Sequence, residues 1–211
     1  MIMRKILLFI STIIILPLSA QNNAEKLLQK TVSKIEKDGG IAMRLACKTV
    51  FDDGSDFTQI ELRMSGTCFY AQTDQSTIWF DGKTMWRGND FGDGIEEIYI
   101  TEPTPEERAR YDIINLLGKH KGFSVDGNGT DSFRLTASDS QRSVEGIKHL
   151  SILVDTKTYA PSLINIHFSE ELGDISARIQ VITYTPGQTF DKKTFTCPVS
   201  DYKDAEIIDL R

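Results

Sequence analysis

Apolar and polar residues alternate with a period of two over much of the chain, which is the pattern of β-strands with one buried face. The alternation covers 60–64, 150–154, 164–168 and 175–181. Turn sequences such as Asp52-Asp53-Gly54, rather than helices, separate the runs. Tight turns join antiparallel strands, and a sheet of about ten or eleven strands tends to curl. We therefore expect an α+β protein built on one strongly curved antiparallel sheet.

Two segments have helical spacing instead. The first spans residues 24–37, with apolar residues on one face and Lys and Glu on the other. Asn22 followed by Glu25 predicts a capping-box start, and Gly39-Gly40 predicts the end. The apolar stripe of this helix consists of Leu27, Leu28, Val32 and Ile35.

The second predicted helix has a better marked start. Thr104 is a suitable N-cap, Pro105 fits the first helical position, and Glu107 completes a capping box. The helix should end at Gly118. Its apolar positions form one stripe, which needs another part of the molecule to pack against, and comprise Ala109, Ile113, Leu116 and Leu117.

The first twenty residues read as a secretory signal peptide (1–20) rather than as part of the fold. Two basic residues precede an apolar run over 6–16, and small residues lead up to Ala20. We expect cleavage after Ala20 and one mature domain over 21–211. An uncleaved membrane anchor is the alternative, because Leu18 is an imperfect residue two positions before the cut. The next residue is Gln21 rather than Cys, so no lipid anchor is expected.

Composition and motifs narrow the functional classes. The chain has 24 Lys and Arg against 30 Asp and Glu, giving a net charge of −6. This acidic balance argues against nucleic acid as a partner. The sequence contains no G-x-S-x-G elbow, H-E-x-x-H motif, phosphate loop or dinucleotide fingerprint. His120, His149 and His167 fall on different predicted elements without a neighbouring carboxylate or thiol, so we expect no enzyme activity, metal site or cofactor.

The cysteines do not form a disulfide framework. Cys47, Cys68 and Cys197 are an odd number in an oxidising compartment, and none belongs to a C-x-x-C pair. A first hairpin centred on Gly54 would place Cys47 opposite Glu61, two strands away from Cys68 and out of disulfide reach. We expect the three cysteines to pack as small apolar residues, and we expect that stability requires no disulfide.

The segment 78–86 places large apolar residues on both sides of an Asp81-Gly82 turn. A two-residue turn would pair Phe80 with Lys83. One face of the hairpin would then carry Trp79 and Trp86, and the other Ile78, Phe80 and Met85. One of these apolar faces meets the inside of the sheet, and the other needs a cover, such as a packed helix, or a ligand.

Several segments together resemble the LolA family of periplasmic lipoprotein carriers, and more closely the LolA-like proteins of Bacteroidetes-type bacteria. The resemblance extends over essentially the whole mature chain. Its parts are the leader ahead of an amphipathic helix and the runs Trp79–Trp86, Ile98–Thr104, Phe190–Phe195 and Ile207–Arg211. It implies an incomplete antiparallel β-barrel of about eleven strands whose concave apolar face is covered by helices, in agreement with the strand count.

The same resemblance implies a non-enzymatic carrier that binds lipoprotein acyl chains in an apolar groove and shuttles them from the inner to the outer membrane. The implied partners are acylated lipoproteins, an inner-membrane lipoprotein-releasing ABC transporter and an outer-membrane receptor, and we expect the carrier to be a monomer. The helix after Pro105 is the expected lid. The residues expected to line the groove and lid are Ile60, Leu62, Met64, Phe69, Ile78, Phe80, Met85, Trp86, Ile113, Leu116, Leu117, Ile152, Ile166 and Phe168.

One feature of the family is missing. Well-known members have an Arg-Pro step before this region, and that Arg ties the lid helices shut. The corresponding stretch here, 66–71, contains no Arg, so we assign no residue to lid locking. The alternative function is a regulatory domain on the same fold, which senses lipid or lipoprotein without shuttling cargo.

Overall fold

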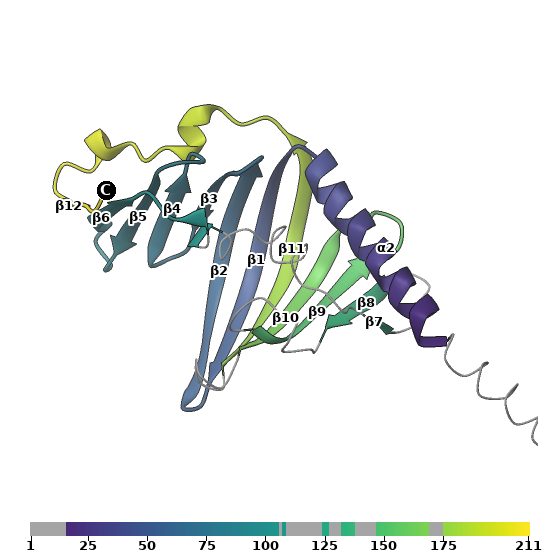
Figure 1. Cartoon of the computed structure of the whole chain (residues 1–211). Coiled ribbons are helices and arrows are strands. Elements are labelled where there is room, and N and C mark those ends of the chain that lie inside the picture. The colour runs from purple at the N-terminus through teal and green to yellow at the C-terminus, as the bar shows by residue number, and fades with distance from the viewer. Residues whose placement is uncertain (1–15, 106, 109–123, 127–131, 138–146, 169–174) are drawn as a thin grey trace, which may run out of the picture.

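The computed structural model describes residues 16–105, 107–108, 124–126, 132–137, 147–168 and 175–211. The strands among these residues form one sheet of twelve, in the order β12-β6-β5-β4-β3-β2-β1-β11-β10-β9-β8-β7. Helix α2 (Leu16–Lys37) lies across one face of this sheet (Figure 1). Strands β12 and β7 are its two edges, so the described sheet is not closed. The prediction of an incomplete, curved β-barrel is confirmed.

The first half of the chain builds the sheet from its centre outward, and the second half builds it from the opposite edge back to the centre. The first half consists of β1 (Gly40–Phe51), β2 (Gly54–Ser65), β3 (Cys68–Gln72), β4 (Ser76–Phe80), β5 (Met85–Asp90) and β6 (Ile95–Thr101). The second half consists of β7 (Ser124–Asp126), β8 (Ser132–Ala137), β9 (Ile147–Asp155), β10 (Pro161–Phe168) and β11 (Ser176–Gln188). Antiparallel pairing of β1 with β11 joins the two halves.

The last strand departs from the purely antiparallel prediction. β12 (Glu206–Asp209) pairs with β6 in parallel, with Ile207 beside Ile98. Two short 3-10 helices, η2 (Lys192–Phe195) and η3 (Val199–Asp201), lie between β11 and β12. In Figure 1 this segment crosses from β11 over the β3 to β6 side of the sheet. A crossover, unlike a hairpin, allows parallel pairing.

Helix α2 begins earlier than predicted and ends where predicted. It starts at Leu16, so Asn22 lies inside the helix and does not cap it. Of the residues between Leu16 and Asn22, only Pro17 is a helix breaker, and it is tolerated because it lies in the first turn. The helix ends at Lys37, and Gly39 then adopts a φ of 69°, which glycine reaches without strain. No helix within the described ranges is long and apolar enough to cross a membrane.

The start of the second predicted helix is confirmed in atomic detail. The Thr104 N–H donates to Glu107 Oε2 at 2.8 Å, and the Glu107 N–H donates to Thr104 Oγ1 at 3.3 Å. This reciprocal pair is a capping box. The Arg108 N–H donates to the Thr104 carbonyl at 2.9 Å, which is the first helical hydrogen bond. The predicted lid positions Ile113, Leu116 and Leu117 lie outside the described residues.

The hairpin between β4 and β5 has the predicted faces but a different register. Phe80 pairs with Met85 rather than with Lys83. The Asp81 carboxylate accepts the N–H groups of Lys83 and Thr84, which makes a four-residue connection in place of a two-residue turn. The pairing is therefore shifted by two residues, and such a shift leaves every side chain on its predicted face.

The C-terminal segment covers the tryptophan face of this hairpin. Trp79, Ile98, Ile100 and Cys197 form a buried cluster, which we call the outer cluster, with Tyr70, Trp86, Ile95, Val199, Tyr202 and Ala205 packed around it. Tyr202 meets Trp79 edge-on, with ring centroids 6.1 Å apart. The cover needed on this face is thus supplied by the short 3-10 helix η3 and its flanking residues.

The three cysteines are free thiols. Cys47 pairs with Thr58 and Cys68 with Ser65, so the predicted position of Cys47 opposite Glu61 is wrong. The hairpin turns at residues 52–53, and this sets the register. The conclusion about disulfides is unaffected, because β2 separates Cys47 on β1 from Cys68 on β3, and their partners on β2, Thr58 and Ser65, are far apart along that strand.

If the C-terminal segment shields Trp79, replacing Tyr202 by Ala should expose that ring to water. We expect Tyr202→Ala to lower the free energy of unfolding by about 2 kcal/mol and to shift tryptophan emission to longer wavelength. Urea unfolding followed by fluorescence measures both. Ser200→Ala, an exposed position in the same segment, is the control. Unchanged emission in Tyr202→Ala would show that the segment does not cover the ring.

A reductant should leave the melting temperature unchanged, because the three cysteines are free. Burial, with a smaller contribution from the charge of Asp201, raises the pKa of Cys197 to about 12. At pH 8 the Cys197 thiolate is therefore scarce, and alkylation of this thiol should be slow until the protein unfolds. Mass spectrometry of alkylated peptides, with and without urea, tests this. Rapid native labelling of Cys197 would contradict its burial.

Candidate functional site

One face of the sheet is apolar across most of its width. We call this the inner face, and it is the face on which α2 packs. Its buried side chains, each 9% exposed or less, form what we call the inner cluster, together with Ala24, Leu28 and Ile35 of α2. The strand members are Ile41, Met43, Leu45, Met64, Phe69, Phe80, Met85, Leu135, Ile147, Leu150, Ile152, Val154, Ile164 and Ile166. The period-two alternation produces this face, because every second side chain points to it.

The predicted groove residues divide into three groups. Ten of them lie in the inner cluster or pack against it: Met64, Phe69, Phe80, Met85, Ile152 and Ile166 are buried, and Ile60, Leu62, Ile78 and Phe168 are partly buried. Trp86 was expected in the groove but lies in the outer cluster, because it pairs directly with Trp79 and shares its face. The three lid positions lie outside the described residues.

Sequence reasoning missed part of the inner face. Ile41, Met43 and Leu45 alternate along β1 and are buried, yet they were not among the predicted groove residues. The alternation of apolar residues at 41–45 was the signal that could have identified them. The apolar stripe of α2 was predicted, but its position against the sheet could not be derived from a single helix.

The C-terminal end of α2 is held to the sheet by a polar contact. Tyr184 of β11 donates its hydroxyl hydrogen to Asp38 Oδ2 at 2.8 Å, and Lys34 forms an ion pair with the same carboxylate. Burial raises the pKa of Tyr184 above its ordinary value, and the hydrogen bond to Asp38 adds to this rise. The helix is thus held at this end while its apolar stripe packs on the inner face.

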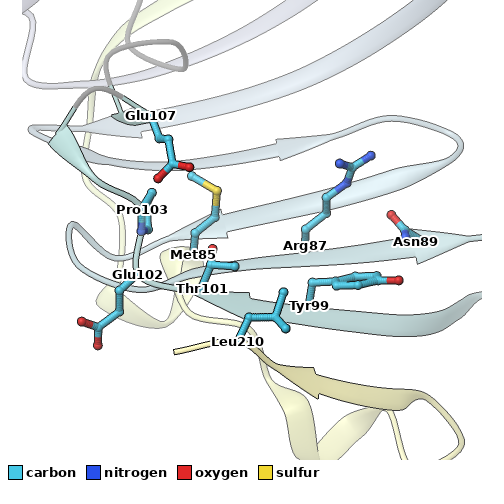
Figure 2. Close-up of a pocket in the computed structure, with 9 residues that line it drawn as sticks. All are labelled: Met85, Arg87, Asn89, Tyr99, Thr101, Glu102, Pro103, Glu107 and Leu210. Carbon is cyan, nitrogen blue, oxygen red and sulfur yellow. The ribbon is translucent and has the colours of Figure 1, made fainter.

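A pocket of about 650 Å³ lies where the inner face reaches β5 and β6. Its walls are Met85, Arg87 and Asn89 of β5, Tyr99 and Thr101 of β6, and Glu102, Pro103, Glu107 and Leu210. Figure 2 shows the β5 and β6 side chains rising from the same side of the two neighbouring strands. Arg87 pairs with Tyr99, and Met85 with Thr101. The pocket was not predicted, although polar residues alternate at 87–89 and 97–101.

Hydrogen bonds order the polar end of the pocket. Asn89 Nδ2 donates to Glu97 Oε2 at 3.3 Å, and the Tyr99 hydroxyl donates to the same oxygen at 3.1 Å. The hydrogen bond to the Glu97 carboxylate raises the pKa of Tyr99, because it stabilises the neutral phenol. At the other end, Lys83 forms an ion pair with Glu102 at 3.1 Å.

Two of the histidines lie on different strands, as predicted, and are neighbours in the sheet. His149 and His167 pair across β9 and β10, with ring centroids 5.7 Å apart. Burial lowers the pKa of His149, and the charge of His167 lowers it further. No group of three His, Cys, Asp or Glu residues that could hold a metal ion is found in the part of the chain that the structure describes.

The contact between Tyr184 and Asp38 predicts a pH dependence of stability. The pKa of Tyr184 is higher in the folded than in the unfolded protein, where it is about 10. Its contribution is therefore complete below pH 10 and is lost as the pH rises above that value. Tyr184→Phe should lower the free energy of unfolding by about 1 kcal/mol at pH 7 and less at alkaline pH. Urea unfolding at pH 7 and 10.5 tests this, and an equal loss at both would contradict it.

The fold is shared with solved bacterial structures. An uncharacterized conserved protein from Thermus thermophilus has a TM-score of 0.54 at 10% identity, covering 86% of this chain and 98% of that one. A DUF1329 family protein from Desulfovibrio piger has a TM-score of 0.50 at 6% identity, covering 85% and 98%. A LolA superfamily protein from Nitrosomonas europaea has a TM-score of 0.40 at 12% identity, covering 82% and 98%.

Sequence comparison supplies the family. None of the curated proteins matches this chain. The family model described as outer membrane lipoprotein carrier protein LolA matches residues 17–170, which is well over half of the sequence. The match takes in α2, the inner-face strands from β1 to β10 and the start of the capped helix. The chain therefore belongs to the LolA family of outer membrane lipoprotein carrier proteins.

Proposed function

We propose that this protein carries acylated lipoproteins between the inner and outer membranes, with their acyl chains against the inner face of the sheet. The observation that carries the proposal is the extent of the inner cluster. Every strand from β5 across to β7 contributes apolar side chains to it, buried or partly buried. If this face served only the stability of the protein, a smaller apolar area, permanently buried under α2, would be enough.

Burial of acyl chains against the inner face would be strongly favourable in free energy. Each buried CH₂ group contributes about 0.8 kcal/mol, so the chains of a lipoprotein have a large free-energy gain from leaving water. Release at the target membrane requires that the net affinity stay moderate. Helix α2 packs against the inner face. A ligand that displaces part of this packing binds less tightly by the free energy lost, and release becomes feasible.

The partners follow from this role and from the family. We propose that the cargo is handed over by an inner-membrane lipoprotein-releasing ABC transporter and accepted by an outer-membrane receptor. The leader at 1–20 and the acidic net charge support export to the periplasm and work there as a monomer. The apolar residues of the inner face are suited to binding rather than to catalysis, so we assign no catalytic residue, metal or cofactor.

Equilibrium binding of a fluorescent long-chain acyl probe to delipidated protein tests the proposal. Both tryptophans belong to the outer cluster, so the emission and anisotropy of the probe should be followed rather than tryptophan quenching. Saturable binding is expected. If binding does not saturate, the carrier role should be dropped in favour of a regulatory domain on the same fold.

Leu62 offers a direct test of the inner face, because its side chain is only partly buried and packs against the inner cluster. Leu62→Gln should weaken acyl-probe binding about fivefold, since an amide would meet the chain in place of a methyl group. The matched control is Ile182→Gln, at a position on β11 that is 52% exposed and belongs to neither cluster. Equal effects of the two substitutions would place the acyl chain elsewhere.

A further inference from the structure

The pocket at β5 and β6 is continuous with the inner face. Met85 belongs both to the inner cluster and to the pocket wall. Beyond it on the same face of β5 come Arg87 and Asn89, so the surface changes from apolar to polar within one strand. An acyl chain on the inner face that ended at Met85 would bring its polar end into this pocket.

Arg87 is the one cation among the described residues that line the pocket. The carboxylates nearby are already engaged, since Glu102 pairs with Lys83, Glu107 accepts the Thr104 N–H, and Glu97 accepts from Asn89 and Tyr99. Within the described ranges Arg87 forms no ion pair, and its side chain is exposed. In Figure 2 its guanidinium projects away from the strands, apart from Glu102 and Glu107.

The backbone of Arg87 is fixed on both sides. Its strand position pairs with Ile78 of β4 and with Tyr99 of β6. The next residue, Gly88, packs so closely against Ile95 that an added Cβ would lie 2.8 Å from Ile95 Cδ1. Strand β5 is therefore held in the middle of three paired strands, and the guanidinium extends from a rigid base.

We propose that this pocket binds the oxygen-bearing polar head of an acylated ligand, with Arg87 as the principal donor. A guanidinium has five N–H donors and no acceptor, so it matches clustered ester, amide or phosphate oxygens. The pocket volume of about 650 Å³ is large enough for a small polar head group. This inference rests on the proposed function, because the chains of the same ligand would lie on the inner face. The head belongs either to the glyceryl-cysteine of a lipoprotein or to a phospholipid.

Three fluorescent probes with the same chain length separate the contributions of head and chain. They are a diacylglyceryl-cysteinyl peptide, a phosphatidylglycerol and a hydrocarbon without a head. Arg87→Gln should weaken binding of a head-bearing probe about tenfold and leave the hydrocarbon within about twofold, because only the head loses its donor. Arg178→Gln, at an exposed position of β11, is the control and should change none of the three.

If Arg87→Gln lowers the affinity for the peptide probe alone, the head belongs to a lipoprotein. If it lowers the affinity for phosphatidylglycerol alone, the head is a phosphate. Lower affinity for both probes supports recognition of the oxygen atoms that the two heads share. The inference is overturned if Arg87→Gln weakens all three probes equally or none of them while the wild type binds them. If the wild type binds no probe, the proposed function fails as well. Thermal melting of the variant confirms that it is folded.

Discussion

The apolar inner face of the sheet has to be shielded from water, and the placement of the other elements follows from this requirement. Helix α2 packs on the inner face and is held there at its C-terminal end by Tyr184 and Asp38. On the opposite face, the C-terminal segment covers the apolar cluster around Trp79. Other positions of that face are polar, as in the hydrogen bond from Asn165 to Ser151, or carry single exposed apolar side chains such as Ile182. Each of the two buried apolar clusters in the described structure thus has its own cover.

The C-terminal segment and helix α2 are attached to the sheet in different ways. The C-terminal segment is tied to the sheet by β12, whose backbone pairs with β6, and by packing around Trp79. Helix α2 is joined to the sheet by the connection to β1 and by side-chain contacts, among them the hydrogen bonds from Tyr184 to Asp38 and from Lys30 to Tyr159. A cover held by side-chain contacts can yield to a ligand at lower cost than one that also pairs with the sheet through its backbone. This difference favours the inner face as the side of the proposed binding and release.

Period-two alternation and capping chemistry predicted much of the fold. The capping box at Thr104 and Glu107 was predicted from three residues and is present in atomic detail. The faces of the 78–86 hairpin were right although its register was wrong, because a two-residue shift preserves faces. The parallel pairing of β12 was not predictable, since a crossover depends on tertiary packing. The same holds for the start of α2, where continuation of a helix overrode a local capping signal.

The candidate site was predicted in its apolar part and missed in its polar part. Alternating Ile, Leu and Met identify a buried face without knowledge of strand order, and most predicted groove residues lie there. Arg87 and Tyr99 become neighbours only through the β5–β6 register. Trp86 was wrongly included among the groove residues, because the predicted hairpin already placed it on the face of Trp79, opposite Phe80 and Met85. A single sequence does not show which polar residues of different strands lie side by side. Their grouping becomes visible only in three dimensions.

The position of the acyl chain is the central claim, and photochemical labelling tests it most directly. A lipopeptide with a diazirine in its acyl chain would be bound and irradiated, and its adducts would be mapped by peptide mass spectrometry. Adducts are predicted on inner-face residues such as Leu62, Met64 and Phe69, with Trp79 and Tyr202 unlabelled. Labelling concentrated on the outer cluster, or labelling that unlabelled lipopeptide does not compete away, would contradict the claim.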